Sequence, residues 1–169
     1  MKVLLLNPPF TDYGGLEGHG GKTMPLNLAY LASYLRLKRP DVEIQILDCE
    51  ALGLRYPEIE TKIREINPNI VGITAPTPAF AQVLEICKII KSISPNIVTV
   101  VGGPHPTALP KETVAEKDID VAVVFEGEIV FTELVNAIDK KIPLDKIRGI
   151  VFKDKNNNII QTLPGEPIK

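Results

Sequence analysis

The sequence predicts an α/β protein: a doubly wound, five-stranded parallel sheet with helices on both faces and a β-hairpin near the carboxyl end. Short apolar runs of strand length alternate with segments whose apolar residues recur at helical spacing. The strand-like runs are apolar throughout, which is typical of parallel strands covered by helices on both faces. A chain of 169 residues suits one such domain.

The predicted strands are rich in leucine or β-branched residues and are bounded by turn residues. They cover residues 3–6, 44–47, 70–74, 97–101 and 121–125. Apolar stripes at helical spacing predict helices over residues 28–35, 59–66, 80–90 and 130–138. A shorter helix is expected after Pro110, because its fixed φ suits a first helical turn. This alternation implies right-handed crossovers between parallel strands.

The pattern changes after the last helix. Residues 149–153 and 159–162 flank a polar stretch at 154–158, which predicts a β-hairpin. We therefore expect residues 1–145 to form the α/β domain and residues 146–169 to form the hairpin and a linker. The end of the chain, rich in proline and glycine, is typical of a connection to a further domain.

Composition excludes several classes of function. The chain is 44% hydrophobic and 24% charged, and its net charge of −2 comes from 19 basic and 21 acidic residues that are scattered along it. This pattern predicts no nucleic-acid partner. No apolar run approaches the roughly 18 residues of a membrane span, and the first run stops at Asn7-Pro8-Pro9, too soon for a signal peptide. We expect a cytoplasmic protein without a membrane partner.

The only two cysteines are Cys49 and Cys87. Two thiols cannot supply the usual four ligands of a zinc site or hold an iron–sulfur cluster unaided. Cys87 falls on the apolar side of a predicted helix, and we expect it to pack in the core as a small hydrophobic residue.

The loops that follow the strands differ from those at the opposite edge. Residues 7–24 are rich in glycine, and the later loops read Thr74-Ala75-Pro76-Thr77-Pro78, Gly102-Gly103-Pro104-His105-Pro106-Thr107 and Glu126-Gly127-Glu128. In an open parallel sheet, ligands bind beyond the carboxyl ends of the strands. Adjacent glycines allow a ligand to approach the backbone closely, although Gly102 and Gly103 could also serve only a tight turn.

Several of these segments resemble those of a known protein family. Asn7-Pro8-Pro9, residues 25–32, Val71-Gly-Ile-Thr74, the Gly-Gly-Pro-His-Pro-Thr block and Glu126-Gly127-Glu128 resemble the amino-terminal domain of cobalamin-dependent radical S-adenosylmethionine proteins. The resemblance covers essentially the whole chain, and the Gly-Gly-Pro-His-Pro block is its most specific part. The sequence departs from the family pattern at Phe125, where the family often has a further glycine.

The resemblance implies a flavodoxin-like, Rossmann-like fold that holds a corrinoid at the carboxyl edge, with the nucleotide tail between strands and helices. The corrin ring is a disc with apolar faces and an amide-bearing rim, which suits small residues and backbone groups. The cofactor-binding residues that the resemblance implies are Asn7, Pro8, Pro9, Thr74, Ala75, Thr77, Gly102, Gly103, Pro104, His105, Thr107, Glu126, Gly127 and Glu128.

The cobalt is expected to have no protein ligand. Other cobalamin families carry Asp-x-His-x-x-Gly after the first strand, whereas the nearest stretch here, residues 17–22, has glutamate at the first place and Lys22 in place of the glycine. His19 is thus a weak candidate for a cobalt ligand. His105 lies one strand away from where such a ligand would arise, and we expect it to serve hydrogen bonding or turn geometry.

The resemblance also places the chemistry outside this chain. Such enzymes hold an iron–sulfur cluster with Cys-x-x-x-Cys-x-x-Cys, and no such run occurs here. The cluster and S-adenosylmethionine are therefore assigned to a radical S-adenosylmethionine catalytic domain of the same parent chain, a methyltransferase or related enzyme. We do not expect this domain to be catalytic on its own.

Three alternatives remain. Residues 15–23 resemble a phosphate-binding P-loop with Asp48 as a possible magnesium ligand, but five residues instead of four separate Gly15 from Gly21. The same fold without cobalamin could act as a scaffold or substrate-contact domain. A receiver domain of signalling proteins needs a cluster of acids after the first strand, where this sequence has asparagine and prolines.

Overall fold

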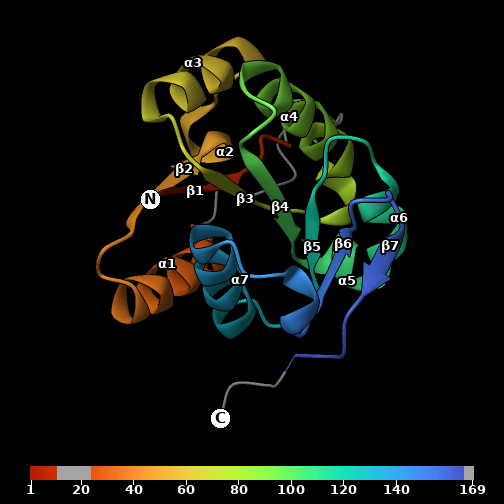
Figure 1. Ribbon diagram of the computed structural model, residues 1–169. Coiled ribbons are helices and arrows are strands. Elements are labelled where there is room, and N and C mark those ends of the chain that lie inside the picture. The colour runs from red at the N-terminus through yellow and green to blue at the C-terminus, as the bar shows by residue number, and fades with distance from the viewer. Residues whose placement is uncertain (11–23, 166–169) are drawn as a thin grey trace.

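The structure is a computed structural model that describes residues 1–10 and 24–165. One sheet runs through the molecule in the order β2-β1-β3-β4-β5-β6-β7 (Figure 1). Its strands are β1 (Lys2–Asn7), β2 (Glu43–Asp48), β3 (Ile70–Thr74), β4 (Val98–Gly102), β5 (Val121–Val123), β6 (Ile150–Lys153) and β7 (Ile159–Gln161). The first five strands are parallel, and β6 and β7 are antiparallel additions beyond β5.

The connecting segments are mostly helical. The α-helices are α1 (Leu26–Lys38), α2 (Cys49–Leu52), α3 (Tyr56–Ile66), α4 (Phe80–Ile93), α5 (Pro104–Ala108), α6 (Pro110–Ala115) and α7 (Glu128–Lys140). The described residues also form two 3₁₀ turns, η1 (Thr77–Ala79) and η2 (Leu144–Lys146). Within the described residues, none of the helices has the length and apolar character needed to cross a membrane.

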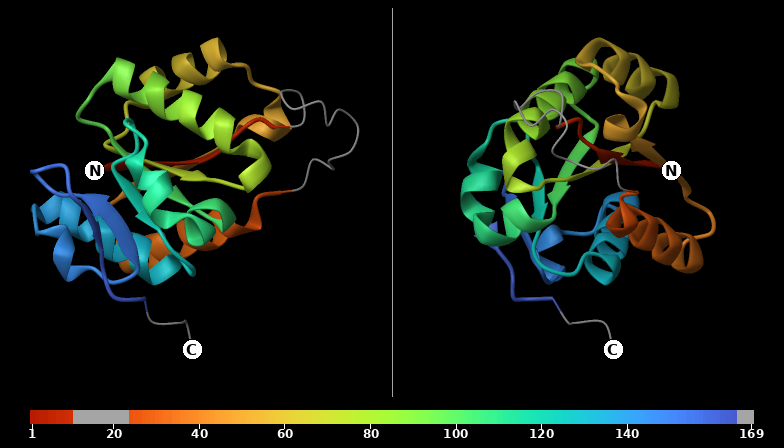
Figure 2. Two further views of the ribbon diagram at one scale, coloured as in Figure 1. Left: turned by 90° about the vertical axis from the view of Figure 1, so that its right-hand side faces the viewer. Right: turned by 180° about the vertical axis from the view of Figure 1, so that it is seen from behind.

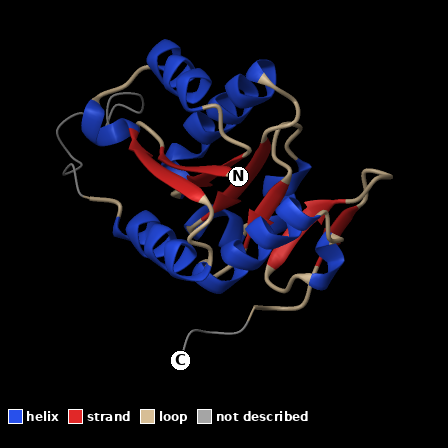
Figure 3. Ribbon diagram, turned by 60° about the vertical axis from the view of Figure 1, so that its left-hand side comes forward, coloured by secondary structure: helices blue, strands red, loops and turns tan. Residues whose placement is uncertain are grey.

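Helices cover both faces of the sheet, with α1 and α7 on one side and α3 and α4 on the other (Figures 2 and 3). Successive residues of a strand point to opposite faces. In β1, Leu5 packs beneath α1 and α7, whereas Leu4 and Leu6 pack beneath α3 and α4, and all three are buried. Burial on both faces explains why the strands are apolar throughout.

The predicted fold class is confirmed, and the structure refines it in two places. The hairpin joins the main sheet, because β6 pairs with β5 through Ala122 and Val151. The fifth strand ends at Val123 and not at residue 125, since Phe125 has a left-handed φ of 66° that cannot continue a strand.

Two short helices were not predicted. Residues 104–108, interpreted from sequence as loop, form α5 directly after Gly103. Helix α2 follows β2 without a break, because the Asp48 carboxylate caps it by accepting a hydrogen bond from the Ala51 backbone N–H at 3.0 Å.

Asp120 ties β4, α4 and the start of β5 together. Its Oδ2 accepts hydrogen bonds from the Thr99 backbone N–H at 2.8 Å, the Thr99 hydroxyl at 3.0 Å and the Lys91 ammonium at 2.5 Å. Thr99 is fully buried, so its N–H has no access to water if this acceptor is lost.

We therefore expect Asp120→Ala to lower the free energy of unfolding by about 2 kcal/mol in urea denaturation. The matched control is Asp118→Ala, because Asp118 contributes to this cluster only through its backbone carbonyl. Its expected loss is below about 0.5 kcal/mol. Equal losses in the two variants would contradict a structural role for the Asp120 carboxylate.

Candidate functional site

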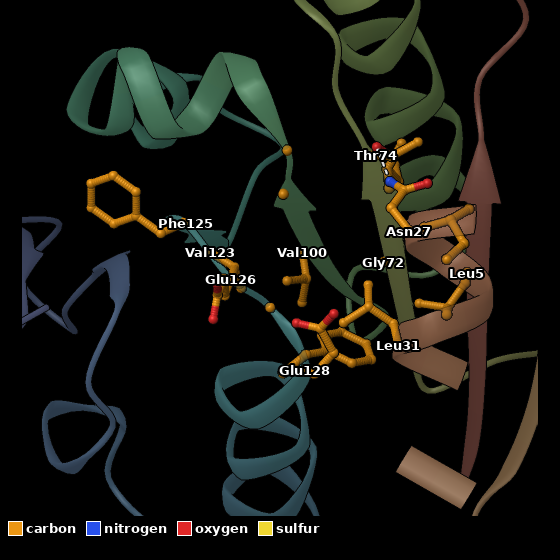
Figure 4. Close-up of a pocket in the computed structure, with 16 residues that line it drawn as sticks. Leu5, Asn27, Leu31, Gly72, Thr74, Val100, Val123, Phe125, Glu126 and Glu128 are labelled. Atoms are coloured by element: carbon orange, nitrogen blue, oxygen red, sulfur yellow. Dashed lines mark hydrogen bonds between the residues drawn. The ribbon is translucent and has the colours of Figure 1, made fainter. Parts of the chain in front are cut away.

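A slot of about 220 Å³ opens at the carboxyl edge of the sheet, between the strands and helices α1 and α7 (Figure 4). Its walls are largely apolar, and several of these side chains belong to the core beneath the two helices. The slot is lined by Leu5, Asn27, Leu28, Leu31, Gly72, Ile73, Thr74, Val100, Gly102, Gly103, Val123, Phe125, Glu126, Gly127, Glu128 and Phe131.

Gly72, in the middle of β3, leaves backbone instead of a side chain in the slot. A Cβ at this position would lie 2.9 Å from Leu5 Cδ2 and 3.2 Å from Phe131 Cε2. The neighbouring side chains therefore leave no room for any residue other than glycine unless they shift. Glycine thus lets the side chains of Leu5 and Phe131 pack against the backbone of β3 beside the slot.

The two glycines at the end of β4 have different roles. Gly102 has open space beside it, since a Cβ there would meet only Val123 Cβ at 3.9 Å. Gly103 has φ 103°, and a Cβ would lie 3.3 Å from both the Ala75 nitrogen and Thr74 Oγ1. Gly103 is thus required by the turn itself, whereas Gly102 keeps the slot open.

Backbone hydrogen bonds join the loops that follow β3 and β4. The Ala75 N–H donates to the Gly102 carbonyl at 2.8 Å, and the His105 N–H donates to the Ala75 carbonyl at 3.0 Å. On the other side, the Asn27 amide of α1 donates to Thr74 Oγ1 at 2.9 Å. The Thr74 hydroxyl keeps its own proton for donation to a ligand oxygen.

Glu126, Gly127 and Glu128 form the entry to α7. A Cβ at Gly127 would approach Leu31 Cδ2 at 3.1 Å, so glycine allows the start of α7 to pack closely on α1. Glu128 lies in the first turn of the helix, where the helix dipole favours a negative charge. Both carboxylates lie beside the slot (Figure 4) and can accept hydrogen bonds from a ligand.

Phe125 occupies a conformation that glycine would adopt without strain. Its φ is 66°, in the left-handed region, where an L-residue costs roughly 1–2 kcal/mol. Its backbone N–H donates to Thr107 Oγ1 at 3.1 Å, and the residue is 69% exposed. This backbone explains physically why a glycine suits the place that Phe125 takes in the family pattern.

Only part of the predicted site lines the slot: Thr74, Gly102, Gly103, Glu126, Gly127 and Glu128. The other predicted residues lie outside its lining: Asn7, Pro8, Pro9, Ala75, Thr77, Pro104, His105 and Thr107. Some of them build the edge, as Asn7 does by donating from its amide to Asp48 Oδ1 at 2.9 Å. Sequence reasoning missed Gly72, although a glycine inside an apolar strand indicates close approach of another group.

His105 is buried under the edge of α4. Its ring stacks on Phe80 with 3.6 Å between ring centroids, only 7% of the residue is exposed, and Nδ1 has no hydrogen-bond partner. Burial lowers the pKa of His105 below its ordinary value of 6.5. The imidazole is therefore held neutral at neutral pH.

The other candidate ligands do not form a metal site in the part of the chain that the structure describes. No group of three histidine, cysteine, aspartate or glutamate side chains there is placed to hold a metal ion. Cys49 and Cys87 are fully buried, as expected for Cys87, and burial raises the pKa of the Cys49 thiol to about 12. His19 and the P-loop-like residues 15–23 lie outside the described residues.

The fold and the slot define an α/β domain of flavodoxin-like topology, with a cavity at the carboxyl edge of its parallel strands. The model of the B12 binding domain family matches residues 18–135. The chain belongs to this family of cobalamin-binding domains.

Curated relatives extend well beyond this chain. An uncharacterised methyltransferase of Pyrococcus horikoshii is 38% identical over 169 residues, which are 99% of this chain and 36% of the relative. An anaerobic magnesium-protoporphyrin IX monomethyl ester cyclase of Rubrivivax gelatinosus is 34% identical over 171 residues, covering 99% of this chain and 30% of the cyclase. The chain spans about a third of the length of these relatives.

Solved structures share the fold at low identity. The cobalamin-dependent S-adenosylmethionine radical enzyme OxsB, with aqua-cobalamin and S-adenosylmethionine bound, gives a TM-score of 0.82 at 20% identity over 98% of this chain and 22% of OxsB. The radical S-adenosylmethionine methyltransferase TsrM of Kitasatospora setae, with cobalamin and a [4Fe-4S] cluster bound, gives a TM-score of 0.79 at 20% identity over 99% of this chain and 30% of TsrM.

A receiver domain shares less of the fold. The receiver domain of NtrC4 from Aquifex aeolicus gives a TM-score of 0.53 at 14% identity, over 85% of this chain and 100% of that domain. The described structure thus agrees better with the cobalamin-binding variant of the fold than with the receiver variant.

The buried His105 predicts a pH-dependent stability. Because its folded-state pKa lies below 6.5, the unfolded chain binds more protons once the pH falls below that value. Acidification should therefore lower the free energy of unfolding, and His105→Gln should reduce the slope measured by urea denaturation between about pH 5 and pH 7. His19→Gln replaces the only other histidine. If the pH dependence of the free energy of unfolding decreased only in His19→Gln, this would contradict its assignment to His105.

Proposed function

We propose that this chain binds a corrinoid at the carboxyl edge of its sheet, with the nucleotide tail in the slot and the corrin disc outside it. The observation that carries the proposal is the open space that Gly102 leaves in the slot, where a Cβ would meet only Val123 Cβ at 3.9 Å. A cavity kept open by glycine beneath two helix ends suits a flat, mostly apolar group that must lie against the strands.

The residues in the slot fit the chemistry of the tail. The apolar side chains of Leu5, Val100 and Val123 suit an aromatic base, and the Thr74 hydroxyl can donate to a tail oxygen. The carboxylates of Glu126 and Glu128 can accept hydrogen bonds from ribose hydroxyls.

The remaining predicted residues are proposed to frame the edge on which the disc rests: Asn7, Pro8, Pro9, Ala75, Thr77, Pro104, His105 and Thr107. When bound, the corrinoid supplies a cobalt centre that can accept and release a methyl group. The role of this chain's own residues is to bind the tail, orient the disc and exclude water from the slot.

We further propose that the domain is part of a longer radical S-adenosylmethionine enzyme of the methyltransferase type. Residues 1–145 hold the corrinoid, and residues 146–169 lead through the hairpin to a catalytic domain that carries the iron–sulfur cluster and S-adenosylmethionine. The family membership, the lengths of the curated relatives and the methyltransferase and radical-enzyme names among the similar proteins support this proposal.

Corrinoid retention tests the proposal. Hydroxocobalamin is added to the purified chain, free cofactor is removed by desalting, and the visible spectrum is recorded. We expect the wild type to retain the corrinoid spectrum and both Gly102→Val and Gly103→Val to lose it. Gly102→Val should keep its fold, because its Cβ has room, so its loss of retention reports filling of the slot.

The control for these variants is Ala115→Val, which adds the same side chain at an exposed position of α6 outside the slot lining. It should retain the corrinoid. Retention by Gly102→Val would contradict the slot as the tail site. A wild type that loses corrinoid on desalting would instead favour the scaffold or substrate-contact function.

We propose that no protein histidine coordinates the cobalt. His105 is buried against Phe80 and does not line the slot. A nucleotide base that binds in the slot would also be kept off the metal. Electron paramagnetic resonance of the Co(II) form should therefore show no nitrogen hyperfine splitting in the wild type, His19→Ala or His105→Ala. Splitting that disappears only in His19→Ala would identify His19 as a ligand.

A further inference from the structure

Phe125 combines two features that the folded chain does not use. Its ring belongs to none of the buried hydrophobic clusters and is left 69% exposed, and its backbone is left-handed at φ 66°. The other described non-glycine residues with positive φ are Asn67 and Lys141, which end helices, and Asn157 in the hairpin turn. Left-handed backbone is common in such places. A large aromatic residue between a strand and a helix has no comparable reason for it.

The position of Phe125 is fixed by hydrogen bonds on both sides of the loop. Its own N–H donates to Thr107 Oγ1 of α5 at 3.1 Å. The preceding N–H, of Val124, donates to the Gly149 carbonyl at 2.9 Å. The backbone from which the ring projects is therefore held between α5 and the base of the hairpin before any ligand arrives.

That place is the rim of the slot. Phe125 belongs to the lining, yet Figure 4 shows its ring pointing outward from the slot, on the side away from Leu5 and Leu31. A cofactor whose tail fills the slot leaves its disc at this rim. An exposed aromatic ring beside the opening, on a backbone held by hydrogen bonds, is a suitable surface for a broad apolar disc.

We propose that the ring of Phe125 contacts the apolar surface of the corrin macrocycle and positions the disc at the carboxyl edge. This inference rests on the proposed corrinoid function and adds a positioning residue to it. Glycine would relieve the backbone strain but would offer the disc no surface. Strain that is retained at a ligand-facing position is the pattern expected when the binding function requires the side chain.

The test measures dissociation constants by absorbance titration with hydroxocobalamin and with diaquacobinamide, which has a corrin disc but no nucleotide tail. Phe125→Asn removes the ring and places a residue that tolerates left-handed backbone. It should weaken binding of both corrinoids by about tenfold, whereas Phe125→Tyr should bind as the wild type does. Gly102→Val, which fills the slot, should weaken hydroxocobalamin binding far more than diaquacobinamide binding.

Stability supplies an independent readout. Relief of the strain should raise the melting temperature of ligand-free Phe125→Asn by roughly 2–4 °C. The matched control is Leu37→Asn, which removes a 74% exposed apolar side chain in the last turn of α1, away from the slot lining. It should change neither dissociation constant.

Each of the other outcomes would overturn either this inference or the proposed function. Unchanged binding of both corrinoids by Phe125→Asn would overturn the inference and leave the proposed function standing. Weakened binding of hydroxocobalamin alone would show that the ring contacts the tail, and a lowered melting temperature would show that the ring serves the fold, so either result overturns the inference. A wild type that binds neither corrinoid would refute the proposed function itself, and the inference with it.

Discussion

The slot depends on a missing side chain at the end of β4. Strands β1, β3, β4 and β5 present apolar residues to α1 and α7. At Gly102 this layer is interrupted, and a Cβ there would meet only Val123 Cβ at 3.9 Å. A gap of this kind forfeits dispersion contacts in the ligand-free protein. A ligand that fills it restores those contacts, so binding and stability are coupled at this residue.

Parallel topology determines what surrounds the gap. Because the strands point the same way, the turns after β3, β4 and β5 meet at one edge, and backbone hydrogen bonds join Ala75 to Gly102 and His105. Gly103 and Phe125, two of the described residues with positive φ, both lie at this edge. The positive φ of Asn67 and Lys141 belongs to helix ends, where left-handed backbone is common, whereas Gly103 and Phe125 lie between a strand and a helix. Functional sites are where such departures are expected.

The regular elements could be predicted from the sequence, because burial on both faces makes parallel strands uniformly apolar and amphipathic helices periodic. The edge was predicted for the same topological reason. The apolar part of the slot lining was not, since Leu5, Leu28 and Val123 carry the same side chains as any core residue. Helix α5 was missed because two prolines within five residues resemble a loop. The early end of β5 was missed because a left-handed φ at Phe125 is not expected of a large aromatic residue.

The hairpin is more than an appendage to the sheet. By pairing with β5, the hairpin turns a potential edge strand into an internal one. The three residues of β5 are then not exposed to pairing with another chain. Its first residues also reach the site, because the Gly149 carbonyl accepts from Val124 and holds the strand end that leads to Phe125. Gly165 lies close to Gly149 and to Val130 of α7, so the chain after the hairpin packs beside the same loop. The segment that sequence assigns to a connection therefore also helps to shape the rim of the slot.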